Sequence, residues 1–246
     1  MMPLSAQAGV PDRPATSDAS LVSAGPTPPL GTPPPLGTPP PAPAPVGEVR
    51  PGRCTGREPD TYALPGGLSL VQILREDLAR HGGDWTLPGF RALAVHRFGV
   101  WHRTLRSRAV RKVLGRVWLS MYRYVRNRYG IELPYTAVIG RRLRIEHQHG
   151  IVLHGFCRVG DDCTIRQGVT IGNKSVQSAL MAPVLGDRVD VGAGAVIVGD
   201  VVVGDGARVG ANAVVVRDVP AGVTVVGIPA RVVPASSPTP STPAPE

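Results

Sequence analysis

Aliphatic residues recur at every sixth position in the second half of the chain, and this period restricts the fold more than any other feature. An α-helix repeats about every 3.6 residues and an isolated strand about every two, so neither explains a period of six. The period is typical of a parallel β-helix, in which each hexapeptide forms one flat face and its aliphatic side chain points inward. The positions are Ile139, Ile145 and Ile151, then Leu153, Val159, Ile165 and Ile171, then Leu185, Val191, Ile197, Val203, Val209 and Val215.

Small residues follow the same repeat. Glycine comes directly after the aliphatic residue at Gly140, Gly160, Gly172, Gly186, Gly192, Gly204 and Gly210, and we expect it to serve tight corners with unusual backbone dihedrals. Four places after the aliphatic residue stand Cys157, Cys163, Val169, Ala195, Ala207 and Ala213, which would permit close stacking of the coils. We therefore interpret Cys157 and Cys163 as small buried residues and not as reactive thiols.

The composition divides the chain into four parts. Residues 1–66 are rich in proline, with an LGTPPP repeat that favours solvated polyproline II over a packed core, and residues 234–246 are a second tail of this kind. Residues 67–130 carry helical periodicity in three stretches, from about Leu70 to His81, Gly89 to Arg106 and Ala109 to Tyr129. Residues 131–233 form the expected β-helix, which the helices would cap at one end.

Positive charge is concentrated in the helical part. The whole chain has 27 Lys and Arg against 18 Asp and Glu, yet eleven of the basic residues and no acid lie between Trp85 and Ile131. A basic amphipathic segment with aromatic residues suits an anionic membrane surface or a nucleic-acid backbone, and the alternative is a solvated face that attracts anionic metabolites. Because no nucleic-acid-binding motif is present, we do not expect nucleic acid, whereas peripheral membrane contact through 85–131 stays open.

Other features restrict the location and chemistry of the protein. No run of 18 or more apolar residues and no secretory leader is visible, so we expect a cytoplasmic protein. Its three cysteines lie in no metal-binding pattern, so no metal is expected. The run from Asn173 to Pro183 interrupts the repeat, and we expect a loop there that is a reasonable place for a binding site.

The run Glu146-His147-Gln148-His149-Gly150 places two histidines where the repeat otherwise has small residues. Histidine suits general-base chemistry near neutral pH when a carboxylate holds its ring. Glu132 lies fourteen residues before Glu146, about one coil away, and is a candidate for that carboxylate. A surface pair of His and Glu is the alternative, and the roles of His149 and His154 stay open.

The chain resembles the left-handed β-helix acyltransferases and, among them, the serine O-acetyltransferases. The resemblance covers about 70–233 and rests on FRALAVHRFGVWHR at 90–103, IEL and AVIG within 131–140, IEHQHGIVLH at 145–154, VGDDCTIRQGVTIGN at 159–173, the glycine-rich run at 191–220 and VVGIPARVV at 225–233. It implies a left-handed parallel β-helix of hexapeptide repeats after a small helical region. It also implies acetyl-CoA as co-substrate and a homotrimer or dimer of trimers.

The resemblance also implies site residues. His147 matches the catalytic base, and Glu132 falls where the family has the Asp that orients it. Glu146 falls where the family has an Asp that helps to hold the amino acid, and Asp77 is similar to a further substrate-binding Asp. The residues that match the coenzyme A groove are Gly192, Ala193, Gly210, Ala211, Gly227, Pro229, Ala230 and Arg231.

The chain departs from the family pattern in three places. Glu132 and Glu146 replace Asp, and Met181-Ala182 stands where the family has an Arg-His pair that clamps the serine carboxylate. The chain ends without the isoleucine that docks into the sulfhydrylase partner, so that partnership is not expected. The favoured function is serine O-acetylation in cysteine biosynthesis; the alternatives are O-acetylation of a sugar hydroxyl in polysaccharide biosynthesis and a non-catalytic scaffold that binds an anionic surface.

Overall fold

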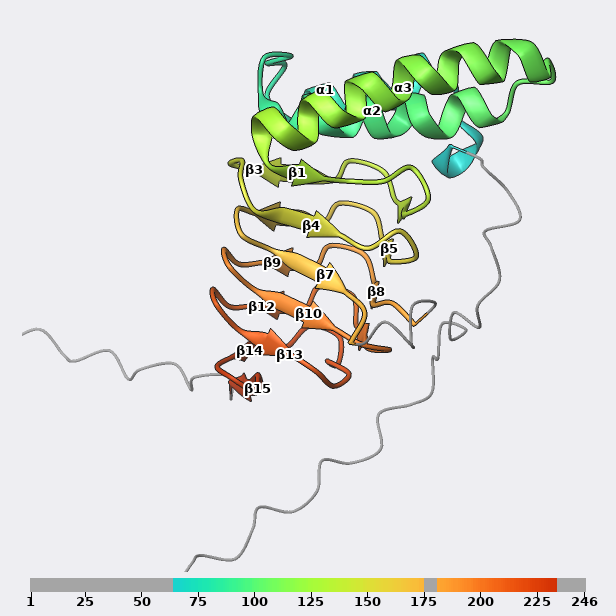
Figure 1. Ribbon diagram of the computed structural model, residues 1–246. Helices are drawn as coiled ribbons and strands as arrows, with labels where there is room; N and C mark the ends of the chain where they lie inside the picture. The colour runs from blue at the N-terminus through green and yellow to red at the C-terminus, as the bar shows by residue number, and fades with distance from the viewer. Residues whose placement is uncertain (1–63, 175–180, 234–246) are drawn as a thin grey trace, which may run out of the picture. The chain divides into compact units, whose positions relative to one another are not determined.

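The computed structural model describes residues 64–174 and 181–233, which all lie in one compact unit. Residues 1–63 of the expected first tail, the second tail 234–246 and residues 175–180 of the expected loop lie outside the described residues. The last three residues of the expected tail 1–66 are described, and Leu64 among them is buried. The described part is a parallel β-solenoid with three α-helices packed on one end (Figure 1), which confirms the fold expected from the period of six.

The helices begin and end where local sequence signals stand. After a short 3-10 turn, Pro65–Gly67, helix α1 spans Leu70–Arg80, α2 spans Pro88–Arg103 and α3 spans Arg108–Tyr129. Ser69 and Gln72 form a capping box on α1, and the Ser107 side chain caps α3. Gly130 ends α3 at φ 63°, a left-handed conformation that glycine adopts without strain. The three predicted helices are therefore confirmed, with boundaries shifted by a few residues.

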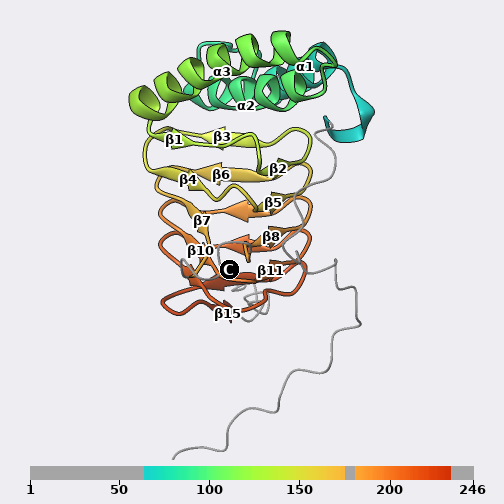
Figure 2. The same cartoon turned by 45° about the vertical axis from the view of Figure 1, so that its right-hand side comes forward.

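The coils contribute strands to three sheets, which we name A, B and C; the first four coils give one strand to each, and the last gives strands to sheets A and C. Sheet A has the order β1-β4-β7-β10-β13, sheet B the order β11-β8-β5-β2 and sheet C the order β15-β14-β12-β9-β6-β3. Figure 2 shows these coils stacked below the helices. All pairs are parallel except β14 with β15. The bounds are β1 Ile131–Glu132, β2 Val138–Ile139, β3 Arg144–Glu146, β4 Ile151–Leu153, β5 Arg158–Val159, β6 Thr164–Arg166, β7 Thr170–Gly172, β8 Val184–Leu185, β9 Asp190–Val191, β10 Val196–Val198, β11 Val202–Val203, β12 Arg208–Val209, β13 Val214–Val215, β14 Thr224–Val226 and β15 Arg231–Val233.

The aliphatic grid forms the core of the solenoid. Every one of its thirteen side chains is at most 4% exposed. The register keeps the column in line, as in Ile145, Ile165 and Val191, which are direct neighbours across β3, β6 and β9. Cys157 and Cys163 are fully buried free thiols, and burial raises the pKa of Cys163 to about 12, which confirms their interpretation as small core residues.

The repeated glycines serve a purpose different from the one we expected. The positive φ values fall two residues later, for example at Arg142 and Asp162, and not at Gly140 or Gly160. A Cβ atom on Gly140 would lie 2.5 Å from the carbonyl of Gly160, and one on Gly160 would lie 2.5 Å from that of Gly186. Glycine is required here because successive coils approach too closely for a side chain, so the expectation of unusual dihedrals at these positions was wrong.

Side chains from the helices satisfy the backbone of the first coil. His96 donates from Nε2 to the carbonyl of Ala137 at 3.0 Å. Arg97 donates to the carbonyls of Ile139 and Gly140 at 2.7 and 2.5 Å, and its Nε pairs with Asp77 at 2.9 Å. Arg97 and Asp77 are both 0% exposed, so this end of the solenoid is sealed by a buried ion pair.

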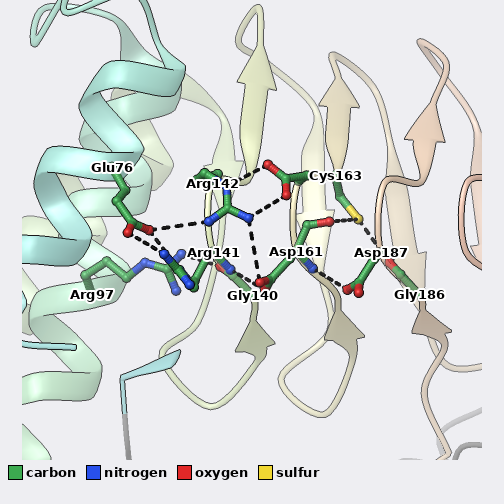
Figure 3. Close-up of polar contacts among 10 residues, drawn as sticks. Glu76, Arg97, Gly140, Arg141, Arg142, Asp161, Cys163, Gly186 and Asp187 are labelled. Atoms are coloured by element: carbon green, nitrogen blue, oxygen red, sulfur yellow. Dashed lines mark hydrogen bonds and ion pairs between the residues drawn. The ribbon is translucent and has the colours of Figure 1, made fainter. Parts of the chain in front are cut away.

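A second, more exposed network joins α1 to two coils (Figure 3). Glu76 accepts two hydrogen bonds from Arg141, at 2.9 and 2.5 Å, and lies 3.7 Å from Arg142. Arg142 in turn makes a bidentate pair with Asp162 in the next coil. Both arginines hold the pKa of their acidic partners, Glu76 and Asp162, below the ordinary range. The network fixes the orientation of α1 over the solenoid.

Replacing Arg97 tests the importance of the buried seal. Arg97→Met should lower the free energy of unfolding by about 3–5 kcal/mol, because it leaves Asp77 as an unpaired buried charge. The double variant Arg97→Met/Asp77→Leu should recover part of the loss, since no lone charge remains. Chemical denaturation measures both; a single variant as stable as the wild type would contradict this role.

His96 gives stability a defined pH dependence. Burial lowers the pKa of His96 to about 3, so the folded protein keeps this ring neutral while the unfolded chain protonates it below about 6.5. This contribution to stability is therefore complete above pH 6.5 and is lost as the pH falls toward 3, by up to about 1.4 kcal/mol per pH unit.

The variant His96→Gln isolates this contribution, because its amide can donate to the same carbonyl without titrating. Denaturation between pH 7 and pH 5 should show a steeper loss of stability in the wild type than in the variant. Equal slopes would mean that His96 does not titrate on unfolding as described.

Candidate active site

The turns that lead from sheet C to sheet A stack into one continuous column, which we call the C–A corner. It comprises residues 147–150, 167–169, 192–195 and 210–213, and residues 227–230 continue it after β14. Backbone hydrogen bonds join the turns: Gly168 donates to His149 at 3.0 Å, Gly194 to Gln167 at 2.8 Å and Asn212 to Ala193 at 2.8 Å. At the lower end, Val214 donates to the carbonyl of Gly227 at 3.0 Å. The expected base and all eight expected coenzyme A residues therefore lie along or directly beside one corner.

Part of the C–A corner consists of glycine and alanine. A Cβ atom on Gly150 would lie 3.3 Å from the Cα of Gly168, and one on Gly168 would lie 3.2 Å from the Cα of Gly194. Ala193 is partly exposed and Ala211 is exposed, and the longer side chains of Gln167, Asn212 and Ile228 are exposed along the same corner. An extended ligand could lie close to the backbone at the small residues, with these longer side chains beside it.

His147 stands at the head of the C–A corner, in the turn between β3 and β4. Its side chain is exposed and its φ is 63°. The turn is held against the end of α3, because the N–H of His149 donates to the carbonyl of Tyr129 at 2.9 Å. Among the described residues no hydrogen bond to the His147 ring is recorded, which leaves its nitrogens available for proton transfer.

Glu132 lies in β1 with its side chain on the outer face of sheet A, beside Val152. Its Oε1 accepts a hydrogen bond from the Tyr122 hydroxyl at 3.3 Å, and in the described residues its recorded partner is this tyrosine and not His147. Burial and the charge of Glu132 raise the pKa of Tyr122 to about 12, so the phenol stays protonated and donates. Tyr122 also stacks on Trp118, with ring centroids 5.1 Å apart.

Tyr122 is a site residue that the sequence analysis missed. Its only sequence signal was its place among the aromatic residues of the basic segment, which suggested a surface position. The structure turns it inward, toward the first coil.

Glu146 ends β3, next to His147, but both oxygens of its carboxylate already form ion pairs. Oε1 pairs with Arg144 and Oε2 with Arg166, each at 3.0 Å, and Arg166 also pairs with Asp190. The Glu146 side chain keeps 26% of its surface exposed. A substrate ammonium group held by Glu146 would therefore compete with two guanidinium groups already in place.

Asp77 lies away from the C–A corner's exposed residues. It is 0% exposed, and its Oδ2 pairs with Arg97 beneath the helices. Burial raises its pKa, and Arg97 opposes that effect. The structure therefore shows Asp77 as a buried partner of Arg97, and the substrate-binding role that the resemblance implies for it stays a prediction.

Metal-binding clusters and membrane-spanning helices are both absent from the described residues. No group of three or more His, Cys, Asp or Glu side chains among them is arranged to hold a metal ion. Likewise, none of the helices in residues 64–174 and 181–233 has the length and hydrophobicity needed to cross a membrane.

The repeat, the capped solenoid and the C–A corner define a protein of the hexapeptide-repeat β-solenoid class. No protein-family model matches the chain. It is 38% identical over 169 residues to the serine acetyltransferase of Helicobacter pylori strain J99, covering 67% of this chain and 94% of that protein. It is 40% identical over 156 residues to the serine acetyltransferase of Mycobacterium tuberculosis, covering 63% of this chain and 65% of that protein.

Solved structures show the same relationship. Soybean serine acetyltransferase, as the apoenzyme, matches with a TM-score of 0.58 and 30% identity over 67% of this chain and 69% of its own. The chain therefore belongs to the serine acetyltransferase family. It spans slightly less than two thirds of the serine acetyltransferases of Synechococcus elongatus and Mycobacterium tuberculosis, 63% and 65% of their lengths.

Proposed function

We propose that the protein is an acetyl-CoA-dependent serine O-acetyltransferase, which converts L-serine and acetyl-CoA to O-acetyl-L-serine and coenzyme A. The observation that carries the proposal is the exposed His147 at the head of the C–A corner. Relatives support it: the soybean enzyme has been solved in complex with serine, and the Brucella abortus serine acetyltransferase in complex with coenzyme A.

In the proposed reaction His147 acts as the general base. Its ring takes the proton from the acceptor hydroxyl as that oxygen attacks the carbonyl carbon of the thioester. The new C–O bond forms, the C–S bond breaks, and the proton leaves with the coenzyme A thiol. Direct transfer between two bound substrates needs no Ser or Cys nucleophile, so the main task of the protein is to position them.

The C–A corner supplies the binding edge in this proposal. Acetyl-CoA would lie along Gly192, Ala193, Gly210 and Ala211, and the final turn from Gly227 to Arg231 would close the lower end. We further propose that the protein is a homotrimer in which this edge faces a neighbouring subunit. Cytoplasmic location fits acetyl-CoA and the two buried free thiols, Cys157 and Cys163.

The base is tested by comparing two histidines of the same turn. His147→Ala should lower kcat by about 10²–10⁴-fold, because the hydroxyl loses its proton acceptor. His149→Ala is the matched control, since His149 is also exposed and has a positive φ of 77°. Thiol release from acetyl-CoA in the presence of L-serine measures both rates.

The comparison of the two variants decides the assignment. Full turnover by His147→Ala would contradict the role of His147. A large loss in His149→Ala with little loss in His147→Ala would move the base to the other histidine. Circular dichroism of both proteins checks that the fold is retained.

O-acetylation of a sugar hydroxyl is the second candidate, and two structural observations favour it. Met181 is 50% exposed and Ala182 is fully buried in the core, so neither side chain offers a polar group to a serine carboxylate. Glu146, the expected partner of the serine ammonium, is already paired with Arg144 and Arg166. An acceptor without charged groups would need neither contact.

An acceptor panel separates the two candidates. With serine as acceptor, thiol release should saturate with L-serine and be weak with nucleotide sugars and glycans. Robust release with a sugar acceptor and none with L-serine would overturn the first choice while leaving His147 as the base.

A further inference from the structure

Helix α3 exposes a continuous apolar stripe that the solenoid does not use. Val110, Val113, Val117, Met121 and Tyr124 are between 40% and 58% exposed. At about 100° per residue they fall within roughly 80° of the helix surface, and they extend over about 20 Å. The buried residues of the same helix, Val125 and Tyr129, lie about 80° and 120° around the helix from the middle of the α3 stripe, so most of the stripe faces away from the core and only Met121 borders it.

A row of positive charge runs beside the α3 stripe. Lys112, Arg116 and Arg123 are exposed, and their positions place them about 60° or more farther around the helix, on the side away from the core. Residues 86–130 contain no Asp or Glu at all. Of the eleven basic residues in this segment, Arg97 is the one the structure buries.

An exposed tryptophan lies at the C-terminal end of the stripe. Trp85 is 65% exposed, and the Arg91 guanidinium lies 5.1 Å from the centre of its ring. Arg91 also donates to the Tyr129 hydroxyl at 2.8 Å, and Tyr129 contacts Tyr124 ring edge to face, with centroids 5.8 Å apart. These contacts place Trp85 near Tyr124, at the C-terminal end of the α3 stripe.

We propose that this surface docks on an anionic phospholipid bilayer. An amphipathic helix with apolar residues on one face, Lys and Arg beside them and an aromatic residue at the boundary has the pattern of interfacial membrane binding. The positive charge indicates which partner covers the α3 stripe. Two copies of this helix would bring like charges together, whereas an anionic bilayer complements the positive charge. A nucleic-acid backbone would match the basic row but leave the α3 stripe in water.

The position of α3 allows this docking without rearrangement. Figures 1 and 2 show the helices together at one end of the solenoid, and α3 contacts α2 and β1. The coils therefore continue away from the helical end. The α3 stripe is separate from the C–A corner, so its docking on a bilayer does not depend on which acceptor the enzyme uses.

Vesicle flotation of the full chain tests the proposal. The protein should float with vesicles of phosphatidylcholine and phosphatidylglycerol and not with phosphatidylcholine alone, and high salt should weaken the binding. Val113→Glu/Val117→Glu should reduce the partition coefficient roughly tenfold or more, because it puts two charges into the apolar stripe. Each of Lys112→Gln, Arg116→Gln and Arg123→Gln should reduce it about fivefold.

The matched control is Val71→Glu on α1, because Val71 is 57% exposed and Val113 is 58% exposed. This variant should bind vesicles like the wild type, and all the variants should keep their rate of thiol release without lipid. Absence of binding to the anionic vesicles, or equal loss in Val71→Glu and Val113→Glu/Val117→Glu, would overturn the proposal.

Light scattering after size-exclusion chromatography tests the alternative that a second copy of the chain covers the α3 stripe. A lower molar mass in Val113→Glu/Val117→Glu than in the wild type would show that the α3 stripe is an interface between copies of the chain, and would also overturn the proposal. Unchanged mass together with lost vesicle binding supports it.

Discussion

The first coil of the solenoid has no coil beyond it, so its backbone groups on that side need partners from elsewhere. A buried carbonyl without a hydrogen bond costs about 1–3 kcal/mol, and a β-helix exposes a full coil of such groups at each end. Here α2 supplies the donors: His96 bonds the carbonyl of Ala137, and Arg97 bonds those of Ile139 and Gly140. Burying Arg97 then requires Asp77 from α1 beside it. The arrangement of the three helices follows from this need.

The same helical cap shapes the candidate active site. The end of α3 leads directly into β1, which carries Glu132, and the carbonyl of Tyr129 holds the turn that contains His147. Tyr122, about two turns before the end of α3, donates to Glu132. The site therefore lies where the regular solenoid meets its cap. At this end of the solenoid, larger polar side chains can interrupt the repeat while a neighbouring coil lies on one side only.

The sequence predicted those structural features that are determined by residues within the same segment, and missed those that depend on contacts with another element. The solenoid was predictable because each aliphatic residue faces the core in its own hexapeptide, and the helices because their apolar residues recur with helical spacing. The caps are local too: Ser69 and Ser107 begin α1 and α3, and Gly130 ends α3. The role of Gly140 was mistaken because its constraint comes from Gly160 in the next coil. The contacts of Asp77 and Tyr122 were not predictable for the same reason: their partners, Arg97 and Glu132, lie on other elements, and periodicity does not reveal which charged or aromatic side chains turn inward.

The basic residues of the helical segment fall into two groups, the buried Arg97 and the ten others. At the end of the solenoid one guanidinium is buried, that of Arg97. It is the one buried residue among the eleven basic residues of the segment. The remaining charge contributes nothing to the seal and lies in part beside the apolar stripe of α3. Because α3 packs on the first coil, a bilayer bound to the stripe would lie nearer to the coil that carries His147 than to the distant coils of the C–A corner. An acceptor presented at that surface would then approach the end of the corner where the proposed base stands, while acetyl-CoA from solution could reach the edge from the other coils.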